Sequence, residues 1–290
     1  MNLFKNILLF GAAALAMVPA SCTKNLSEGS PCGKETVTIY LSADSQTTRT
    51  MLQDDRHVLW TNGDIVVVNE KPYFVTVDSS DPSVAKLENV EKADEYLALY
   101  TVCDIYNGQI YARYYHYDDG IYSMPINELP EYRPGTFAPY ANPMIAWSKD
   151  TNLNFKGLGS VIKVGLTGTD VKLAKAQVYA YGEKYISGFI NITEEQIRAL
   201  DVSAAVIDEE DAPCPASTID CGDGVALSSS SPTYFYFVVA PFEEPSGLAF
   251  GAEDTDGYVY FKNPTKGFSI ACNEVKEMAE IKLERALDVV

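Results

Sequence analysis

Side chains that commonly carry catalysis are scarce in this sequence. Its only histidines, His57 and His116, both lie in alternating apolar stretches typical of β-strands. The sequence holds no CxxC pair, Cys/His cluster, phosphate-binding Walker loop or GxGxxG motif. Forty acidic residues offer many carboxylate pairs, but no pair is distinguished by its setting. We therefore expect a protein that is not an enzyme and that has no metal site and no cofactor.

The clearest chemical signal lies around Cys22, at the end of the first apolar run. Residues 1–21 combine a lysine near the start, an apolar stretch over 7–18 and the small residues Ala20 and Ser21. This pattern predicts an export signal peptide that is too short to span a membrane comfortably. Its end resembles the bacterial lipoprotein signal, in which the cysteine thiol receives a diacylglyceryl group and becomes the mature N-terminus. The resemblance implies that Cys22 is lipidated.

One position departs from the lipoprotein pattern, because Pro19 stands where an aliphatic residue is usual. The alternative is an ordinary secretory peptide followed by an unmodified cysteine. If Cys22 carries palmitate-like chains, each buried methylene contributes about 0.8 kcal/mol, and two or three chains give a stable membrane anchor. Residues 22–34 then form the lipidated cysteine and a flexible polar tether.

Acylation of Cys22 leaves five of the six cysteines, and an odd number cannot all form disulfides. Cys214 and Cys221 stand close together in "CPASTIDC". Since export leads to an oxidising compartment, this pair is the candidate disulfide, closing a small surface loop. We expect the other cysteines to be small buried hydrophobic residues.

The composition favours strands and turns over long helices. Tyrosine occurs 19 times and phenylalanine 12 times, while 19 glycines and 15 prolines supply turns. A length of 290 residues suits one large or two medium domains. The formal charge of −18 would repel a phosphate backbone, so we expect no nucleic-acid partner.

Turn residues divide the first half of the chain into short strands. Residues 35–42 alternate with period two, and residues 57–69 read as a hairpin around Asn62-Gly63. A three-stranded meander follows over 95–124, with one of its turns at Asn107-Gly108.

The second half begins after the proline-rich segment 125–143, which we interpret as a boundary or a long crossover. Thr193 and Gln196 form a capping-box pattern that predicts a short helix. Residues 201–232 predict a long surface loop. The last stretch, 274–290, mixes helical propensity with strand alternation, and we interpret it as a final strand.

These elements predict an all-β protein. We expect two tandem antiparallel β-sandwich domains, over residues 35–150 and 151–290, with the short helix in the second.

The tyrosines of "IYARYYHY" raise the possibility of glycan binding. Tyr111, Tyr115 and Tyr117 fall on one face of the predicted strand, and Tyr114 falls on the other. An exposed aromatic face can stack on sugar rings, whereas a buried one packs as core.

Several segments, taken in order, resemble the fimbrillin-like lipoproteins of Gram-negative anaerobic bacteria of the gut and mouth. Besides the lipoprotein-like start, they are "TTRTML" at 47–52, "VLWTNGDIVVVN" at 58–69, "ANPMIAW" at 141–147 and "LNFKGLGSVIKVGLTG" at 153–168. The remainder agrees only in strand pattern. The resemblance implies transthyretin-like, Greek-key sandwiches in a subunit of a surface fimbria, exported as a lipoprotein to the outer membrane.

The resemblance also implies assembly by strand exchange after an arginine-specific protease has trimmed the chain. Carried onto this sequence, the scissile residue is Arg49, the strand lost is 35–42 and the donor strand is about 277–290. A solvent-facing role for Arg49 within a continuous strand is the alternative. Arg285 and Asp288 interrupt the apolar alternation of the donor, so a subunit that stays anchored, or sits at a fimbrial tip, fits equally well.

The leading hypothesis is a non-enzymatic fimbrial or adhesion lipoprotein. Its expected partners are other fimbrial subunits, of its own or another kind, the outer membrane, and surface ligands on host or bacterial cells. The alternative from another class is a surface glycan-binding lipoprotein of a polysaccharide-uptake system, which requires exposed tyrosines.

Overall fold

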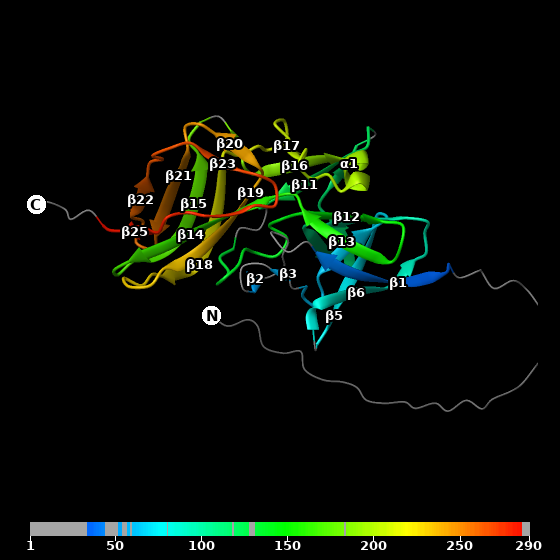
Figure 1. Ribbon diagram of the computed structural model, residues 1–290. Helices are drawn as coiled ribbons and strands as arrows, with labels where there is room; N and C mark the ends of the chain where they lie inside the picture. The colour runs from blue at the N-terminus through cyan, green and yellow to red at the C-terminus, as the bar shows by residue number, and fades with distance from the viewer. Residues whose placement is uncertain are drawn as a thin grey trace, which may run out of the picture. The chain divides into compact units, whose positions relative to one another are not determined.

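The computed structural model describes residues 34–43, 52–53, 57–58, 60–79, 81–117, 119–127, 131–182 and 184–285. The fold described below is that of the unit that begins at Glu35. The predicted signal peptide, Cys22 and Arg49 lie outside the described residues. Figure 1 shows an all-β chain with one short helix among the described residues, so the all-β prediction is confirmed.

Seven strands close into a barrel. Their order around it is β1, β13, β12, β7, β4, β5 and β6, and β6 pairs with β1 to complete the ring. The pair β1–β13 is parallel, and every other pair is antiparallel. The bounds are β1 Thr36–Ala43, β4 Ile65–Val68, β5 Lys71–Asp78, β6 Asp81–Glu91, β7 Tyr96–Tyr100, β12 Met144–Ser148 and β13 Asn152–Gly157.

The barrel interior is filled by apolar side chains that alternate along the strands. Trp60 belongs to this core, with its ring edge-on to Tyr100 and Phe155 at centroid distances of 5.6 and 5.3 Å. Such aromatic contacts stabilise a core beyond simple burial. The predicted domain boundary at residues 150/151 stays a prediction. Strand β13, which begins at Asn152, lies in the barrel.

A second sheet has four strands, in the order β10–β11–β16–β17. Its buried face shares one core with the barrel residues Leu99 and Ile145. Helix α1, Glu194–Ala199, begins directly after strand β16. Thr193 and Gln196 form the reciprocal capping box that the sequence predicts. The bounds are β10 Tyr115–His116, β11 Ile121–Ile126, β16 Gly188–Thr193 and β17 Val206–Ile207.

Two further sheets pack around a third core. One has the order β19–β14–β24, with β25 also pairing with β14, and the other has the order β18–β15–β21–β22. Phe235 and Phe237 of the first sheet share this core with Val178 and Phe250 of the second. The bounds are β14 Ser160–Gly168, β15 Lys172–Ala180, β18 Ala216–Ala226, β19 Thr233–Val239, β21 Leu248–Asp254, β22 Val259–Lys262, β24 Val275–Glu277 and β25 Ile281–Leu283.

Three two-stranded sheets complete the described strands. They are β2 Leu52–Gln53 with β3 His57–Val58, β8 Cys103–Tyr106 with β9 Gln109–Ala112, and β20 Phe242–Glu244 with β23 Phe268–Ile270. In the part of the chain that the structure describes, no helix is long and apolar enough to cross a membrane. Tandem transthyretin-like sandwiches with Greek-key connections stay a prediction.

Candidate functional site

Strand β1 lies in a seam between two other strands of the barrel. On one side it pairs in parallel with β13, through partners such as Leu41 and Leu153, and on the other it pairs antiparallel with β6. Ile39 and Leu41 point into the core and are 0% and 4% exposed, whereas Tyr40 between them is 51% exposed. Removing this strand would leave unpaired backbone groups on both neighbours and an apolar gap between them.

The predicted scissile residue lies close to this seam along the chain. Arg49 falls between the end of β1 at Ala43 and the start of β2 at Leu52. A cut after Arg49 would therefore separate β1 from every other strand of the barrel, since those strands all follow Leu52. After such a cut, β1 would be held by noncovalent contacts, chiefly its backbone ladders and the buried side chains of Ile39 and Leu41.

The predicted donor strand is engaged in the protein's own sheet as far as Leu283. Strands β24 and β25 run parallel to β14, with Val275 opposite Val161 and Ile281 opposite Leu166. Leu283 is 2% exposed and belongs to the third core. Donation of this segment to another subunit would first require breaking these contacts. Residues 286–290 of the predicted donor lie outside the described part of the chain.

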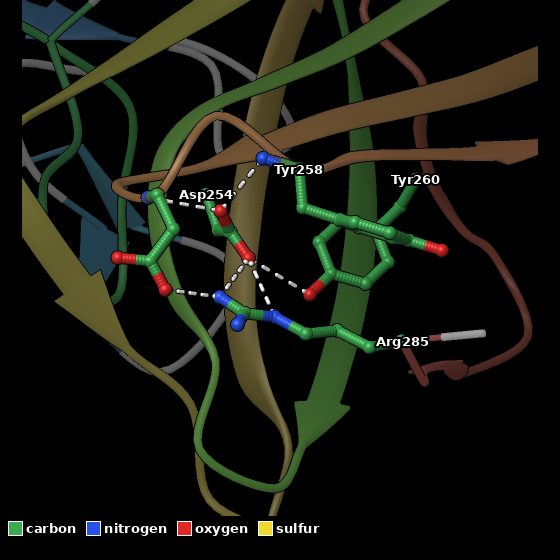
Figure 2. A network of polar contacts seen from close by, with 5 residues as sticks. Asp254, Tyr258, Tyr260 and Arg285 are labelled. Atoms are coloured by element: carbon green, nitrogen blue, oxygen red, sulfur yellow. Dashed lines mark hydrogen bonds and ion pairs between the residues drawn. The ribbon is translucent and has the colours of Figure 1, made fainter. Parts of the chain in front are cut away.

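Arg285 closes this C-terminal segment onto the β21–β22 hairpin. Figure 2 shows its guanidinium and the Tyr260 hydroxyl pointing at the carboxylate of Asp254. Arg285 Nη2 donates to Asp254 Oδ2 at 2.7 Å and also contacts Asp256, and Tyr260 donates to Asp254 Oδ2 at 3.0 Å. The backbone N–H groups of Asp256 and Tyr258 donate to Asp254 Oδ1 at 3.0 and 2.9 Å. We call this arrangement the Asp254–Arg285 clamp.

The Asp254 carboxylate is held in its charged form. Burial, which leaves the side chain 0% exposed, acts to raise its pKa. The hydrogen bonds from Tyr258 N–H, Arg285, the Tyr260 hydroxyl and Asp256 N–H outweigh burial and lower the pKa below the ordinary value of 3.8. A carboxylate with this many donors is a structural anchor for the chain end. From sequence, Arg285 could be interpreted only as an interruption of the donor strand, because no local pattern links it to Asp254, which lies 31 residues earlier.

The edge strand β22 lies beside this clamp. It pairs with β21 on one side only, and its Val259 and Phe261 are 65% and 46% exposed. A hollow of 520 Å³ lies between β22 and residues 282–285. An exposed strand edge next to a hollow is a place where another extended chain can pair.

The four tyrosines considered for glycan stacking fall into two groups. The predicted single strand is interrupted, because β9 ends at Ala112 and pairs with β8, whereas β10 belongs to the β10–β11–β16–β17 sheet. Tyr115 and Tyr117, 49% and 41% exposed, lie 6.2 Å apart by ring centroid, and Phe189 lies 5.3 Å from Tyr115. Phe189 comes from β16, and no local sequence pattern indicates its place in this group.

Tyr111 and Tyr114 form the second group. Tyr111 is 50% exposed, and Tyr114 is half-buried. Both line a hollow that also contains Glu70. The structure therefore leaves three of the four rings well exposed, as glycan stacking requires, but it does not bring all four together.

The two histidines lie in different strands of the fold. His116 stacks on the ring of Tyr122 at 4.2 Å, and its Nδ1 lies 3.8 Å from the carboxylate of Glu70. His57 lies in the two-residue strand β3. Among the described residues, no three His, Cys, Asp or Glu side chains gather in a way that could hold a metal ion.

The predicted disulfide between Cys214 and Cys221 is wrong, since both thiols are free in the structure. Residues 201–232 are not one long loop, because β18 runs through them. The extended chain from Ala216 to Cys221 spans about 16 Å, whereas a disulfide needs its Cα atoms within about 7 Å. Cys214 instead exchanges backbone hydrogen bonds with Ser187.

Three of the described cysteines are expected to react slowly in the folded protein. Burial raises the pKa of Cys103, Cys221 and Cys272 to about 12, so little thiolate is present at pH 8. Iodoacetamide followed by peptide mass spectrometry should label them far more slowly in buffer than in urea. An intact mass lower by two hydrogens without reductant would contradict the free-thiol assignment of Cys214 and Cys221.

No protein-family profile and no curated protein matches the sequence. Solved structures similar to the chain include one described as a "putative cell adhesion protein" from Bacteroides ovatus, at 10% identity and a TM-score of 0.45, covering 81% of this chain and 90% of that one. A protein of the same description from Bacteroides uniformis has 10% identity, a TM-score of 0.44 and coverage of 81% and 88%. The tip fimbrial protein Mfa3 of Porphyromonas gingivalis has 8% identity, a TM-score of 0.29 and coverage of 78% and 81%. Likenesses at these TM-scores carry no argument about function.

Proposed function

We propose that this chain is a non-enzymatic cell-surface lipoprotein, a subunit, anchor or tip component of a fimbria that serves adhesion. It is tethered to the outer membrane through Cys22 and works through the edges of its β-sheets. Its partners are other fimbrial subunits, and surface ligands on host or bacterial cells.

The observation that carries the proposal is the position of β1. A strand near the N-terminus that closes a barrel, pairs on both sides and precedes Arg49 is removable by a single cut. The seam it leaves has two unpaired edges and a place for two apolar side chains, at the positions of Ile39 and Leu41. An extended strand from another subunit satisfies both needs.

The C-terminal end supports the anchor or tip role over that of a repeating subunit. Leu283 is buried in the chain's own core, and Arg285 is held by Asp254. Such a chain can accept a strand from another subunit, but its own last described strand is paired within its own fold. It would therefore stand at one end of an assembly.

The experiment is digestion of the purified mature protein with an arginine-specific protease, followed by gel electrophoresis without boiling. Cleavage after Arg49, located by mass spectrometry, should yield species larger than the monomer, in ladders or as complexes with added subunits. Arg49→Lys keeps the charge but removes the cleavage site, and it is the matched control. Clean cutting that leaves only monomer, both alone and with added fimbrial subunits, would contradict assembly by strand exchange.

Lipidation is a separate prediction. The mature N-terminal peptide should begin at Cys22 and carry the added mass of a diacylglyceryl group, and Cys22→Ser should release the protein from the membrane fraction. Cys32→Ser, which changes another cysteine of the tether region, should leave the protein in the membrane. A mature N-terminus that begins elsewhere, with no acyl mass, would identify an ordinary secretory peptide.

A further inference from the structure

A surface groove joins the β4–β5 hairpin to the segment between β9 and β10. It consists of two adjoining hollows of 270 and 380 Å³. Val67, Glu70 and Tyr114 line both hollows, so the two are parts of one groove. Volumes of about 300 Å³ and more are typical of sites for small ligands. Two hollows that share one aromatic ring suit consecutive units of a chain molecule.

Aromatic rings form part of the groove wall. The ring of Tyr114 stacks with that of Tyr122, with centroids 6.2 Å apart and planes at 26°. His116 stacks on Tyr122 in turn, at 4.2 Å and 8°. Tyr111, which is 50% exposed, lines the hollow on the β9 side. Because the rings support one another, Tyr114 is held in place before any ligand arrives, which lowers the entropy lost on binding.

Charged side chains with planar heads line the β7 and α1 side of the groove. Arg198 of α1 contacts Glu95 at 2.5 Å and Glu194 at 2.7 Å, which fixes both carboxylates. Among the described residues, Glu70 forms no ion pair with a lysine or arginine. His116 Nδ1 lies 3.8 Å from its carboxylate. The groove thus offers acceptors on Glu70, Glu95 and Glu194 and donors on Arg198 to groups that lie over the aromatic rings.

Glu70 occupies a backbone position that favours glycine. The β4–β5 loop is Asn69-Glu70, with φ of 45° and 67°. The β8–β9 loop is Asn107-Gly108, with nearly the same φ of 51° and 75°. Two-residue hairpin loops of this kind prefer Asn-Gly, because a side chain with a positive φ is strained. Glu70 is therefore a poor choice for the turn, yet it lines both hollows of the groove.

From these observations we infer that the groove binds a neutral oligosaccharide. Flat aromatic faces stack on the C–H groups of sugar rings, and planar carboxylate and guanidinium groups bind their hydroxyls. Three carboxylates against one guanidinium disfavour uronic, sulfated and sialylated chains. This inference goes beyond the proposed function and does not depend on it, because none of the groove side chains comes from β1.

Binding is best measured on the uncut mature protein, so that the result is independent of strand exchange. The probes are malto-, cello-, xylo- and mannopentaose, titrated by calorimetry, with oligogalacturonate as the anionic probe and pentalysine as the cationic one. At least one neutral pentaose should bind, and oligogalacturonate should not. Tyr114→Ala should weaken that binding about tenfold. Tyr115→Ala, on the separate Tyr115–Phe189 surface, should change it less than about twofold.

Glu70→Gly is the most informative variant. If Glu70 serves binding, this change weakens the affinity about fivefold. It also raises the melting temperature by about 2 °C, because glycine relieves the positive φ. A lower melting temperature would instead show that Glu70 supports the fold. Binding by no neutral pentaose, loss of binding in Tyr115→Ala but not in Tyr114→Ala, or binding of pentalysine alone would each overturn the inference.

Discussion

Cleavage after Arg49 is expected to release β1 slowly, open the barrel and leave a protein that binds the peptide Thr36–Ala43 in its place. Ile39 is fully buried, and truncating one such side chain costs about 2–5 kcal/mol. Loss of the whole strand removes Ile39, Leu41 and two backbone ladders. That loss is comparable with the total stability of about 5–15 kcal/mol that a typical domain has.

Trp60 provides a natural reporter for this step. It is 3% exposed and lies in the same core as Ile39 and Leu41. Its fluorescence should shift to the red when β1 leaves and return when the synthetic peptide is added. A peptide with the Ile39→Asp change is the matched control, since it keeps the backbone pairing but cannot fill the core. If the cut protein keeps its Trp60 emission and its urea midpoint after β1 has been separated from it, β1 does not close the barrel in solution.

The β8–β9 hairpin and the helix could be predicted because their determinants are local. The hairpin predicted over residues 57–69 is wrong, because β3 pairs with β2, and β4 pairs with β5 and β7. Asn107-Gly108 supplies the two positive φ angles of the β8–β9 loop within four residues of sequence. Thr193 and Gln196 satisfy each other's backbone donors across one helical turn. Such signals do not depend on what the rest of the chain does, and the strand alternation of 35–42 is of the same kind.

The partners of these elements could not be predicted in the same way. Strand β1 pairs with β13, which lies more than 100 residues further along the chain, and nothing in residues 36–43 specifies that neighbour. The acidic and serine-rich composition of 201–232 favoured a loop, but pairing with β15 makes an eleven-residue strand of Ala216–Ala226. Pairing with a distant strand overrode the local propensity of this segment. The predicted Cys214–Cys221 disulfide depended on the loop, so it is wrong for the same reason.

The candidate sites show the same limit. Tyr111 and Tyr114 could be named from sequence because tyrosines cluster visibly at 109–117, yet Glu70 and Arg198 reach their groove from distant elements. Glu70 was open to detection in principle, since Asn-Glu stands where Asn-Gly is usual in a hairpin loop. Arg198 was not, because its position at the groove follows from the packing of α1.

Asp254→Ala is expected to lower the free energy of unfolding by about 3 kcal/mol, because it leaves the donors around this carboxylate without an acceptor. The N–H groups of Asp256 and Tyr258 and the hydroxyl of Tyr260 all lose their acceptor. Arg285→Ala should cost less, about 1–2 kcal/mol, since the other three donors still bind the carboxylate. Asp256→Ala is the control: its side chain is 69% exposed, and the change should cost at most about 0.5 kcal/mol. Urea unfolding at pH 7 measures all three.

The same clamp should make the C-terminal end less stable in acid, because Asp254 must be charged to hold it. Its pKa in the folded protein lies below the ordinary 3.8. The carboxylate therefore contributes stability that is fully present above about pH 4 and is lost as the pH falls through the folded pKa.

Asp254→Asn, which has no charge to lose, should remove that part of the acid sensitivity, so the gap in urea midpoint between the parent protein and this variant should narrow below pH 4. The hydrogen-exchange protection factors of the β25 amides, corrected for the intrinsic exchange rate at each pH, should fall over the same range in the parent protein. A gap that stays constant down to pH 2, or β25 amides already unprotected at pH 7, would show that the clamp does not hold the last strand. The C-terminal segment would then be free for donation, and the anchor or tip role would lose its main support.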